Sequence, residues 1–478
     1  MLFHTWEFAS FFCVVYILYL ILSHKLQNRM LLLASYFFYG SWDWRYLSLL
    51  IASTTVDYFC GLKIQNTDSK QHKKKFVTLS IFVNLSILCI FKYYNFFAEN
   101  FKALMAPMGL EVQPYFLDVA LPLGISFYTF QTMSYSIDVY RGKLKAAENY
   151  LDFALYVSFF PQLIAGPIER GIRLLPQILK KRVLSAEVIS QGLYLILWGF
   201  FLKVFVADNL SKLVDPVFEN FASYDGASIL IAVYAFSIQI YCDFAGYSFM
   251  AIGLGLTMGI QLMENFRRPY FSKNISDFWR RWHISLSSWF RDYMFSPFYI
   301  YLSSLKVFKS LSLKMRHGIV FFVALLAAEY LLGMWHGAGW NFGFFGIYHG
   351  FMIGVYYWIS RYWDKLNRFL QIFLTFQLAA LGWLIFRAPT LGQGYDMFLS
   401  ILFNFGSLFD SNHIDSLQKL FIFSAVLWIV QIFQEKKDNT FVILTLPLFP
   451  RYIVFIALFM LTVMFGDFGE KPFIYFQF

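Results

Sequence analysis

Two histidines stand in segments whose residue types are typical of a reactive site. His336 lies in Gly333-Met-Trp-His-Gly-Ala-Gly-Trp-Asn341, between two long apolar runs. A titratable ring at membrane depth is costly, which indicates a functional role, and an imidazole can exchange a proton near neutral pH. The surrounding glycines permit an irregular backbone, and we expect Trp335 and Trp340 to line a pocket. We predict that His336 is a catalytic base within the bilayer.

His283 is the second candidate, in Phe278-Trp-Arg-Arg-Trp-His-Ile-Ser-Leu-Ser-Ser-Trp-Phe-Arg-Asp-Tyr293. The surrounding segment, 271–302, is too charged to span a membrane and too aromatic to be a free loop. Helical spacing would place its large apolar side chains on one stripe, which predicts a helix lying in the membrane interface. The stripe consists of Trp279, Trp282, Leu286 and Trp289.

The cationic side chains of this segment allow two interpretations. Arginines at an interface commonly extend from a surface anchor to the headgroups. Alternatively, Arg280, Arg281 and Arg291, together with Trp282, bind the phosphates of a nucleotide-bearing donor near His283. We favour donor binding because the cations cluster beside a candidate reactive residue.

The composition of the chain indicates whether it folds in water or in a lipid bilayer. Hydrophobic residues make up 59% of the 478 positions, charged residues only 14%, and 60 residues are phenylalanine. Mean hydropathy is +0.55. These values indicate an all-α polytopic membrane protein. The net charge of +10 does not favour a nucleic-acid partner, because the basic residues lie in short loops beside apolar runs. The four cysteines have no metal-ligand spacing, so we expect neither a metal site nor a disulfide.

The apolar runs predict one membrane domain over 1–478, with roughly 11–13 transmembrane or re-entrant helices. The first run has no basic leader or cleavage site, so we expect it to be retained. The basic loop 63–75 is expected in the cytoplasm, which puts both termini on the periplasmic side and makes 151–166 re-entrant. The runs are 8–23, 30–42, 46–62, 76–97, 117–140, 151–166, 186–207, 227–257, 318–334, 341–360, 368–387, 418–433 and 441–465.

Polar residues interrupt three of these runs, in 123–141, 158–170 and 241–248. Such side chains are expensive in lipid, so we expect them to face one another, an arginine or a wet tunnel. Transporters and membrane acyltransferases both need an internal polar path, and periodicity cannot separate the two classes. No individual role is assigned to these side chains, which are Asp138, Gln162, Glu169 and Asp243.

The three polar segments, the Arg-Arg-Trp-His-Ile-Ser stretch and the Trp-His-Gly motif occur in an order that resembles the alginate O-acetylase branch of the membrane-bound O-acyltransferase (MBOAT) family. The resemblance covers nearly the whole chain. It implies a multi-span fold with a thin central region pierced by a tunnel, His336 as the active-site histidine and His283 as a second functional position. That branch serves O-acetylation of exported polysaccharides such as alginate and peptidoglycan, and a sister branch moves D-alanine toward teichoic acids.

The chain ends in an aromatic hexapeptide, 473–478, within Pro472-Phe-Ile-Tyr-Phe-Gln-Phe478. It resembles the Phe-x-Tyr-x-x-Phe ending associated with acyl relay in the D-alanylation branch. The resemblance implies that Tyr475 is a transient acyl carrier, because an aryl ester is nearly as activated as a thioester. The alternative is an interfacial aromatic anchor after the last span.

Together these features predict a subunit of the bacterial inner membrane that moves acetyl groups outward. The expected donor is cytoplasmic acetyl-CoA, no cofactor is permanently bound, and the expected partner is a periplasmic esterase-like serine O-acetyltransferase. Only the acyl group needs to cross, because CoA is too large and charged to enter the bilayer. D-alanyl transfer from a carrier protein is the alternative within the family. A secondary transporter or lipid flippase is the alternative from another class.

Overall fold

The computed structural model describes residues 1–309, 312–469, 471 and 473–474, and every regular element within these residues is a helix. Contacts divide the chain into two compact units. The first comprises Met1–Ile196 and Tyr247–Met263, and the second Leu197–Gly246 and Glu264–Phe478. The all-α architecture is confirmed, whereas the expectation of a single domain stays a prediction.

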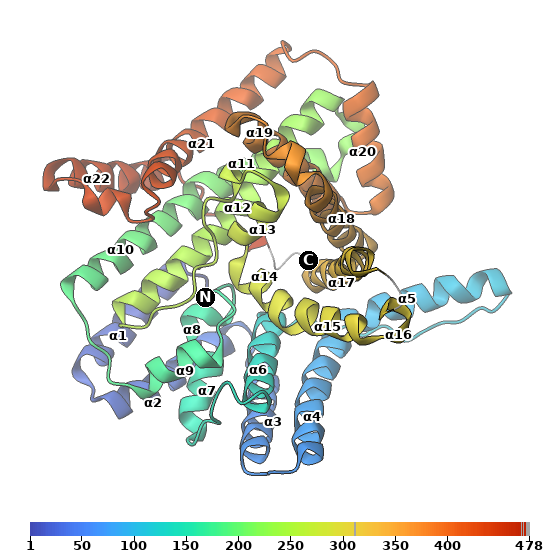
Figure 1. The fold of residues 1–478 in the computed structure, drawn as a ribbon. Helices are drawn as coiled ribbons and strands as arrows, with labels where there is room; N and C mark the ends of the chain where they lie inside the picture. The colour runs from blue at the N-terminus through green and yellow to red at the C-terminus, as the bar shows by residue number, and fades with distance from the viewer. Residues whose placement is uncertain (310–311, 470, 472, 475–478) are drawn as a thin grey trace. The chain divides into compact units, whose positions relative to one another are not determined.

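The first unit contains α1 to α9, the first part of α10 and the last part of α12 (Gly226–Thr257), and Figure 1 labels these helices. Their bounds are α1 Trp6–Ile21, α2 His24–Asp43, α3 Leu47–Gln65, α4 Lys70–Leu88, α5 Tyr94–Met105, α6 Ile125–Tyr140, α7 Tyr150–Ser158, α8 Phe160–Leu163, α9 Gly171–Leu179 and α10 Ala186–Phe200.

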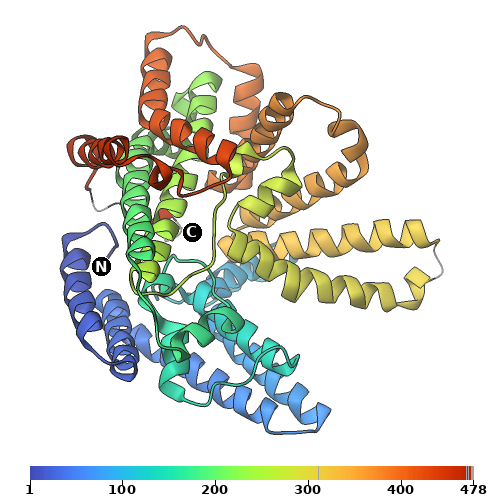
Figure 2. The ribbon, with the colours of Figure 1, turned by 60° about the vertical axis from the view of Figure 1, so that its left-hand side comes forward.

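A buried carboxylate joins three helices of this unit. Asp57 of α3 accepts hydrogen bonds from Asn84 Nδ2 of α4 at 2.7 Å and from Ser136 Oγ of α6 at 3.0 Å, and Ser80 of α4 donates to it as well. A buried carboxylate is tolerated only when hydrogen bonds replace its water shell. These polar contacts therefore hold α3, α4 and α6 together; Figures 1 and 2 both show α3 and α4 side by side.

The second unit contains the two predicted histidines. It begins with the π-helical segment η4 (Phe201–Ala207), which leads directly into α11 (Asp208–Glu219). The other elements are α12 Gly226–Thr257, α13 Ile275–Arg281, α14 Ile284–Phe290, the π-helical η7 Arg291–Phe295, α15 Ser296–Ser304, α16 Lys306–Lys309, α17 Leu313–His336, α18 Trp340–Trp363, α19 Arg368–Arg387, α20 Leu391–Phe403, α21 Ser411–Lys437 and α22 Leu448–Phe465.

Helices α17 and α18 form an antiparallel hairpin whose shared face is rich in small residues. A Cβ atom added to Gly346 would collide with the backbone of Glu329, and one added to Gly354 would collide with the ring of Phe322. Glycine lets two helix backbones approach closely, which is a common packing solution in membranes. The hairpin fixes where α17 ends, and α17 ends at His336. Figure 2 shows α15 beside α17 on this part of the unit.

Within the part of the chain that the structure describes, eight helical segments are long and apolar enough to cross a membrane. This confirms the prediction of a polytopic fold. Segment His24–Gln65 contains two predicted spans, 30–42 and 46–62, which the extended residue Asp43 separates. The others are Lys70–Met108, Ala186–Glu219, Gly226–Thr257, Leu313–His336, Arg368–Arg387, Ser411–Lys437 and Leu448–Phe465.

Two predicted spans differ from the structure. The prediction 117–140 is wrong in its first part, because α6 begins only at Ile125, after Gly124 in the left-handed conformation (φ 72°). The run 151–166 is divided into α7 and the short α8, with an extended turn at Phe159 followed by Pro161. Neither piece is long enough to cross a bilayer.

Candidate active site

His283 occupies a break between two short helices. Helix α13 ends at Arg281, Trp282 is extended, and His283 has φ 43° and ψ 53° before α14 begins at Ile284. The left-handed conformation is costly for a residue with a side chain, and such strained residues cluster at functional sites. The prediction of one continuous interfacial helix is therefore wrong, because Trp282 is extended and His283 has a left-handed backbone conformation that interrupts the helix.

The predicted aromatic stripe is also placed differently. Its four members are all buried, so they pack in the interior of the second unit rather than at a headgroup surface. Trp282, for example, lies 4.6 Å from the ring of Trp383, measured between centroids. The stripe therefore serves as core. The four buried members are Trp279, Trp282, Leu286 and Trp289.

Asn265 holds His283 in place. Its side-chain oxygen Oδ1 lies 3.0 Å from His283 Nδ1 and accepts from the Oγ of Ser285 at 2.8 Å, and its backbone oxygen accepts from Ile284 N at 2.9 Å. An amide oxygen can only accept, so the proton of the His283 ring resides on Nδ1 and the lone pair on Nε2. Sequence reasoning missed Asn265, which no motif or spacing marks as a partner of a distant histidine.

Burial keeps the His283 ring neutral. The surrounding protein lowers the pKa of His283 to about 3, because desolvation disfavours the charged imidazolium. Its closest aromatic neighbours within this unit are Phe244, at 4.6 Å between centroids, and Trp335, at 5.8 Å. A ring with so low a pKa is a poor base at neutral pH but remains an effective hydrogen-bond acceptor at Nε2.

His336 comes to the same place from another helix. It is the last residue of α17, it is buried, and its ring centroid lies 6.5 Å from that of His283. Trp335 contacts both imidazoles and lines the site as expected. Trp340, expected to line the same pocket, is instead 58% exposed. Phe386 forms a further wall at 5.4 Å from His336. The two predicted histidines thus share one aromatic site.

The described residues nearest to the chain end lie at this site. Phe473 and Ile474 are buried, and the ring of Phe473 lies 5.4 Å from that of Phe244, which also contacts His283. Ile474 N donates to Asp243 Oδ2 at 2.7 Å. Tyr475, the predicted acyl carrier, lies outside the described residues, and Ile474 is its immediate neighbour in the chain.

The polar residues that interrupt the apolar runs have separate partners. Asp243 pairs with Lys203 at 2.6 Å, whereas we expected these side chains to face one another, an arginine or a wet tunnel. In the first unit, Gln162 Nε2 donates to Tyr156 O at 2.9 Å, and Glu169 accepts from the backbone of Met263. Burial raises the pKa of Glu169 to about 7. Asp138 is buried in the same unit.

Two of the predicted donor-binding residues line a cavity. Arg280 and Arg291 lie on the wall of a cavity of about 510 Å³, with Ser287, Ser288 and Glu329 contributing further polar groups. The pocket continues along the aromatic and aliphatic side chains of α17. A wall that carries both cationic and apolar side chains suits a ligand with charged and uncharged portions.

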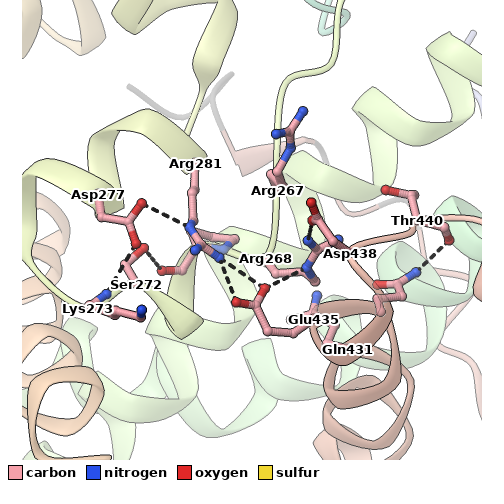
Figure 3. Close-up of polar contacts among 12 residues, drawn as sticks. Arg267, Arg268, Ser272, Lys273, Asp277, Arg281, Gln431, Glu435, Asp438 and Thr440 are labelled. Atoms are coloured by element: carbon pink, nitrogen blue, oxygen red, sulfur yellow. Dashed lines mark hydrogen bonds and ion pairs between the residues drawn. The ribbon is translucent and has the colours of Figure 1, made fainter. Parts of the chain in front are cut away.

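The other two predicted donor-binding residues do not line this cavity. Trp282 is fully buried, and Arg281 pairs with Glu435 at 3.0 Å and with Asp277 at 3.2 Å. Figure 3 shows that Glu435 also binds Arg268, at 2.8 Å. The backbone of this segment is paired as well, since Arg267 N donates to Arg281 O. The network ties the His283 segment to the C-terminal end of α21.

His349 lies near the site without a polar partner. It is fully buried in α18, between Phe345 at 4.6 Å and Trp279 at 5.1 Å. Neither ring nitrogen has a hydrogen-bond partner among the described residues. His349 is therefore packed among aromatic side chains in the interior of the second unit.

The chain is similar to known membrane acyltransferases. Residues 35–387 match the model of MBOAT, the membrane-bound O-acyltransferase family. The chain is 38% identical over 394 residues to the probable alginate O-acetylase AlgI of Azotobacter vinelandii, covering 81% of this chain and 75% of that protein.

Two further relatives carry different names. The peptidoglycan O-acetyltransferase of Helicobacter pylori is 36% identical over 82% of this chain and 78% of its own length. The teichoic acid D-alanyltransferase of Bacillus subtilis is 31% identical over 55% of this chain and 68% of its own length. The family match spans α17, α18 and both site histidines. The chain therefore belongs to the membrane-bound O-acyltransferase family and is a multi-pass membrane O-acyltransferase.

Proposed function

We propose that this protein takes acetyl groups from cytoplasmic acetyl-CoA and passes them through Tyr475 to a periplasmic partner that acetylates an exported or periplasmic polysaccharide. One observation carries the proposal. His283, His336 and the last described residues of the tail lie around one buried aromatic cluster, in which Phe244 contacts both His283 and Phe473. The residues that directly precede Tyr475 in the chain therefore lie at the same aromatic cluster as the candidate base.

The first transfer begins with the Tyr475 phenol. Its oxygen attacks the thioester carbonyl carbon while His336 accepts the phenol proton. A carbon–oxygen bond forms, the carbon–sulfur bond breaks, and the proton passes from His336 to the departing thiolate, so that CoA leaves as the thiol. His283, neutral and protonated on Nδ1, orients a donor group through its Nε2 lone pair. We assign it a positioning role.

The second transfer takes place outside the membrane. A serine oxygen of the partner attacks the acetyl carbon of the aryl ester, the bond to the phenol oxygen breaks, and the phenol recovers the serine proton. The tyrosine is thereby regenerated. The partner, an esterase-like serine O-acetyltransferase, then delivers the acetyl group to a sugar hydroxyl.

The donor is proposed to enter beside Arg280 and Arg291. These guanidinium groups suit the CoA phosphates, and the apolar part of the same cavity suits the uncharged arm. Arg281 is left out of the donor site because it is paired with Glu435. If the short basic turn 435–438 is cytoplasmic, the pairing of Glu435 with Arg268 and Arg281 supports the same side for the arginine segment.

The inner bacterial membrane and periplasmic termini belong to the same proposal. If the turn before α22 is cytoplasmic, α22 crosses once and the tail enters from the opposite face. Donor and acceptor would then reach the histidines from opposite sides. The acetyl acceptor is supported by the relatives named for alginate and peptidoglycan, whose similarity extends over more of this chain than that of the D-alanyltransferase.

The test is mass spectrometry of tail peptides after incubating the purified protein with acetyl-CoA, combined with a CoA-release assay. We expect acetyl on Tyr475 of the wild type, no tail acetylation in Tyr475→Phe, and neither acetylation nor CoA release in His336→Gln. Release of CoA without a mark on Tyr475, even when the partner is withheld, would contradict the relay. If Tyr475 is labelled only when a D-alanyl carrier protein is the donor, the transferred group is D-alanyl and not acetyl.

A further inference from the structure

The segment after α22, which we call the tail and which is described at residues 466–469, 471 and 473–474, contacts a buried charge cluster. The proposed transfer chemistry does not use this cluster. Lys203 of η4 lies between two carboxylates, with Nζ 2.8 Å from Asp208 Oδ1 and 2.6 Å from Asp243 Oδ1. The three side chains are between 2% and 5% exposed. Two carboxylates against one ammonium leave the cluster short of positive charge, which is unfavourable within membrane-spanning helices.

The tail supplies the missing donors. Ile474 N–H points at Asp243 Oδ2, the oxygen not paired with Lys203, at 2.7 Å. A hydrogen bond to an ionised group is shorter and stronger than a neutral one. Lys471 Nζ lies 3.0 Å from the backbone oxygen of Asp208 and 2.6 Å from Ser211 Oγ, so a second cation from the tail stands beside the cluster.

The chain before this point follows the same helical segment. Asp467 N donates to Val204 O of η4 at 3.0 Å, and Asn209 Nδ2 donates to Phe465 O at 2.9 Å. A Cβ atom at Gly466 would lie 2.6 Å from Val204. The segment is therefore held along η4 and α11 from the end of α22, and the amide of Ile474 makes the contact nearest to the chain end among the described residues.

We propose that Asp243, held by Lys203, seats the end of the chain by accepting the Ile474 amide, and thereby sets the depth at which residue 475 is presented to the two histidines. The inference rests on the proposed relay through Tyr475. The contact is made by the backbone, so it fixes position independently of side-chain identity. Neighbouring Cα atoms are about 3.8 Å apart, and residue 475 is one peptide unit beyond the seat. Asp243 and Lys203 are positioning residues.

Seating is tested by thiol accessibility, which requires no activity. Ile474→Cys is introduced after the exposed Cys13 and Cys89 are replaced by serine and the buried Cys242, which precedes Asp243 in the chain, by alanine. The buried Cys60 remains as a reporter of unfolding. In detergent-purified protein, maleimide should label position 474 slowly. Adding Asp243→Asn or Lys203→Gln should raise the labelling rate about tenfold or more, without labelling Cys60. Asp215→Asn, an exposed carboxylate of α11, is the matched control and should leave the rate unchanged.

Presentation is tested by a pair of tail variants. Ile474→Pro removes the amide hydrogen, whereas Ile474→Ala removes most of the side chain and keeps the hydrogen. We expect acetyl incorporation at Tyr475 to fall about tenfold or more in the proline variant relative to the alanine variant. Acetyl-CoA affinity should be equal in both. Both substitutions are at the same position near the end of the chain. A difference in acetylation between the two variants is therefore not explained by loss of folding.

The outcomes separate this inference from the proposed function. Unchanged labelling in Asp243→Asn would overturn the seat, whatever the tail carries. Increased labelling with equal acetylation of the proline and alanine variants would overturn the positioning role. Absence of acetyl on Tyr475 in the wild type would remove the relay and the positioning role together, while increased labelling would still assign Asp243 to holding the tail.

Discussion

The ring centroids of His283 and His336 lie 6.5 Å apart although the two residues come from different helices. The first sits in a left-handed break between α13 and α14, and the second ends α17. Asn265 fixes the tautomer of one ring, and Trp335 packs against both. The two imidazoles therefore differ in their backbone position and in their hydrogen bonding, and we expect their loss to affect transfer differently.

The histidines should differ from a third buried histidine in their effect on transfer. His336→Gln should lower turnover by about 10²- to 10⁴-fold, because a general base is lost. His283→Gln should lower turnover by a smaller factor, about 10²-fold, because this residue positions the donor and is not the base. His349→Gln is the matched control, since its ring nitrogens have no hydrogen-bond partner among the described residues, and it should stay within about threefold of wild type. Turnover is measured as CoA release per folded protein. Equal losses in all three variants would indicate a packing defect.

Asn265→Ala should impair catalysis by releasing His283. The change removes the acceptor of His283 Nδ1 and of Ser285, and misplacement of the ring should lower kcat by up to about 10²-fold with little change in KM. Ser285→Ala removes only one donor to the same oxygen and should keep most activity. Steady-state kinetics of the two variants make the comparison. A kcat loss in Ser285→Ala as large as that in Asn265→Ala would argue against the tautomer assignment.

Arg280→Gln and Arg291→Gln should weaken donor binding. Each removes a cation from the cavity wall, and a hydrogen bond to a charged group contributes about 1.5–3 kcal/mol, so the Kd for acetyl-CoA should rise about tenfold or more. Arg267→Gln is the control, because Arg267 pairs with Glu264 on the surface. Calorimetric titration with acetyl-CoA gives the Kd. A rise in the control equal to that in the cavity variants would mean only a general loss of positive charge.

Glu435→Gln should loosen the segment that carries His283. The change removes the partly buried carboxylate that Arg268 and Arg281 share, and a hydrogen bond to a charged group contributes about 1.5–3 kcal/mol. Thermal unfolding and hydrogen exchange of residues 264–283 measure the effect. Asp292→Asn, which breaks a surface pair with Arg291, should change stability by less than about 1 kcal/mol. If residues 264–283 exchange no faster in Glu435→Gln than in Asp292→Asn, the anchoring role of Glu435 is refuted.

His283 should make the fold sensitive to acid. Its pKa is about 3 in the folded protein and near 6.5 when unfolded, so the unfolded chain binds the proton first as pH falls. Stability contributed by keeping this ring neutral is complete above pH 6.5 and is lost toward pH 3, by roughly 1.4 kcal/mol per pH unit. Melting temperatures at pH 7 and pH 5 should therefore drop less in His283→Gln than in wild type. Identical drops would show that the ring does not protonate on unfolding.

Several helices could be predicted from the sequence because their cause is local. Residues 227–257 and 368–387 are continuous apolar stretches that can satisfy their backbone only as helices in lipid, and both were predicted within one residue of α12 and α19. The Trp-His-Gly motif marked His336 because a titratable ring between apolar runs needs a reason. Composition and motif order together were enough for the family.

Tertiary structure alone decided which polar groups meet. The tryptophan stripe predicted a continuous helix, but the long-range bonds of Asn265 to His283 and Ile284 stabilise a left-handed break that local periodicity cannot foresee. Arg280 and Arg281 are adjacent in sequence, yet one lines a cavity and the other pairs with Glu435. Asp243 gained its partners from η4 and from the chain end. Such pairings depend on residues far apart in the chain, and their energy appears only when packing removes water from both partners.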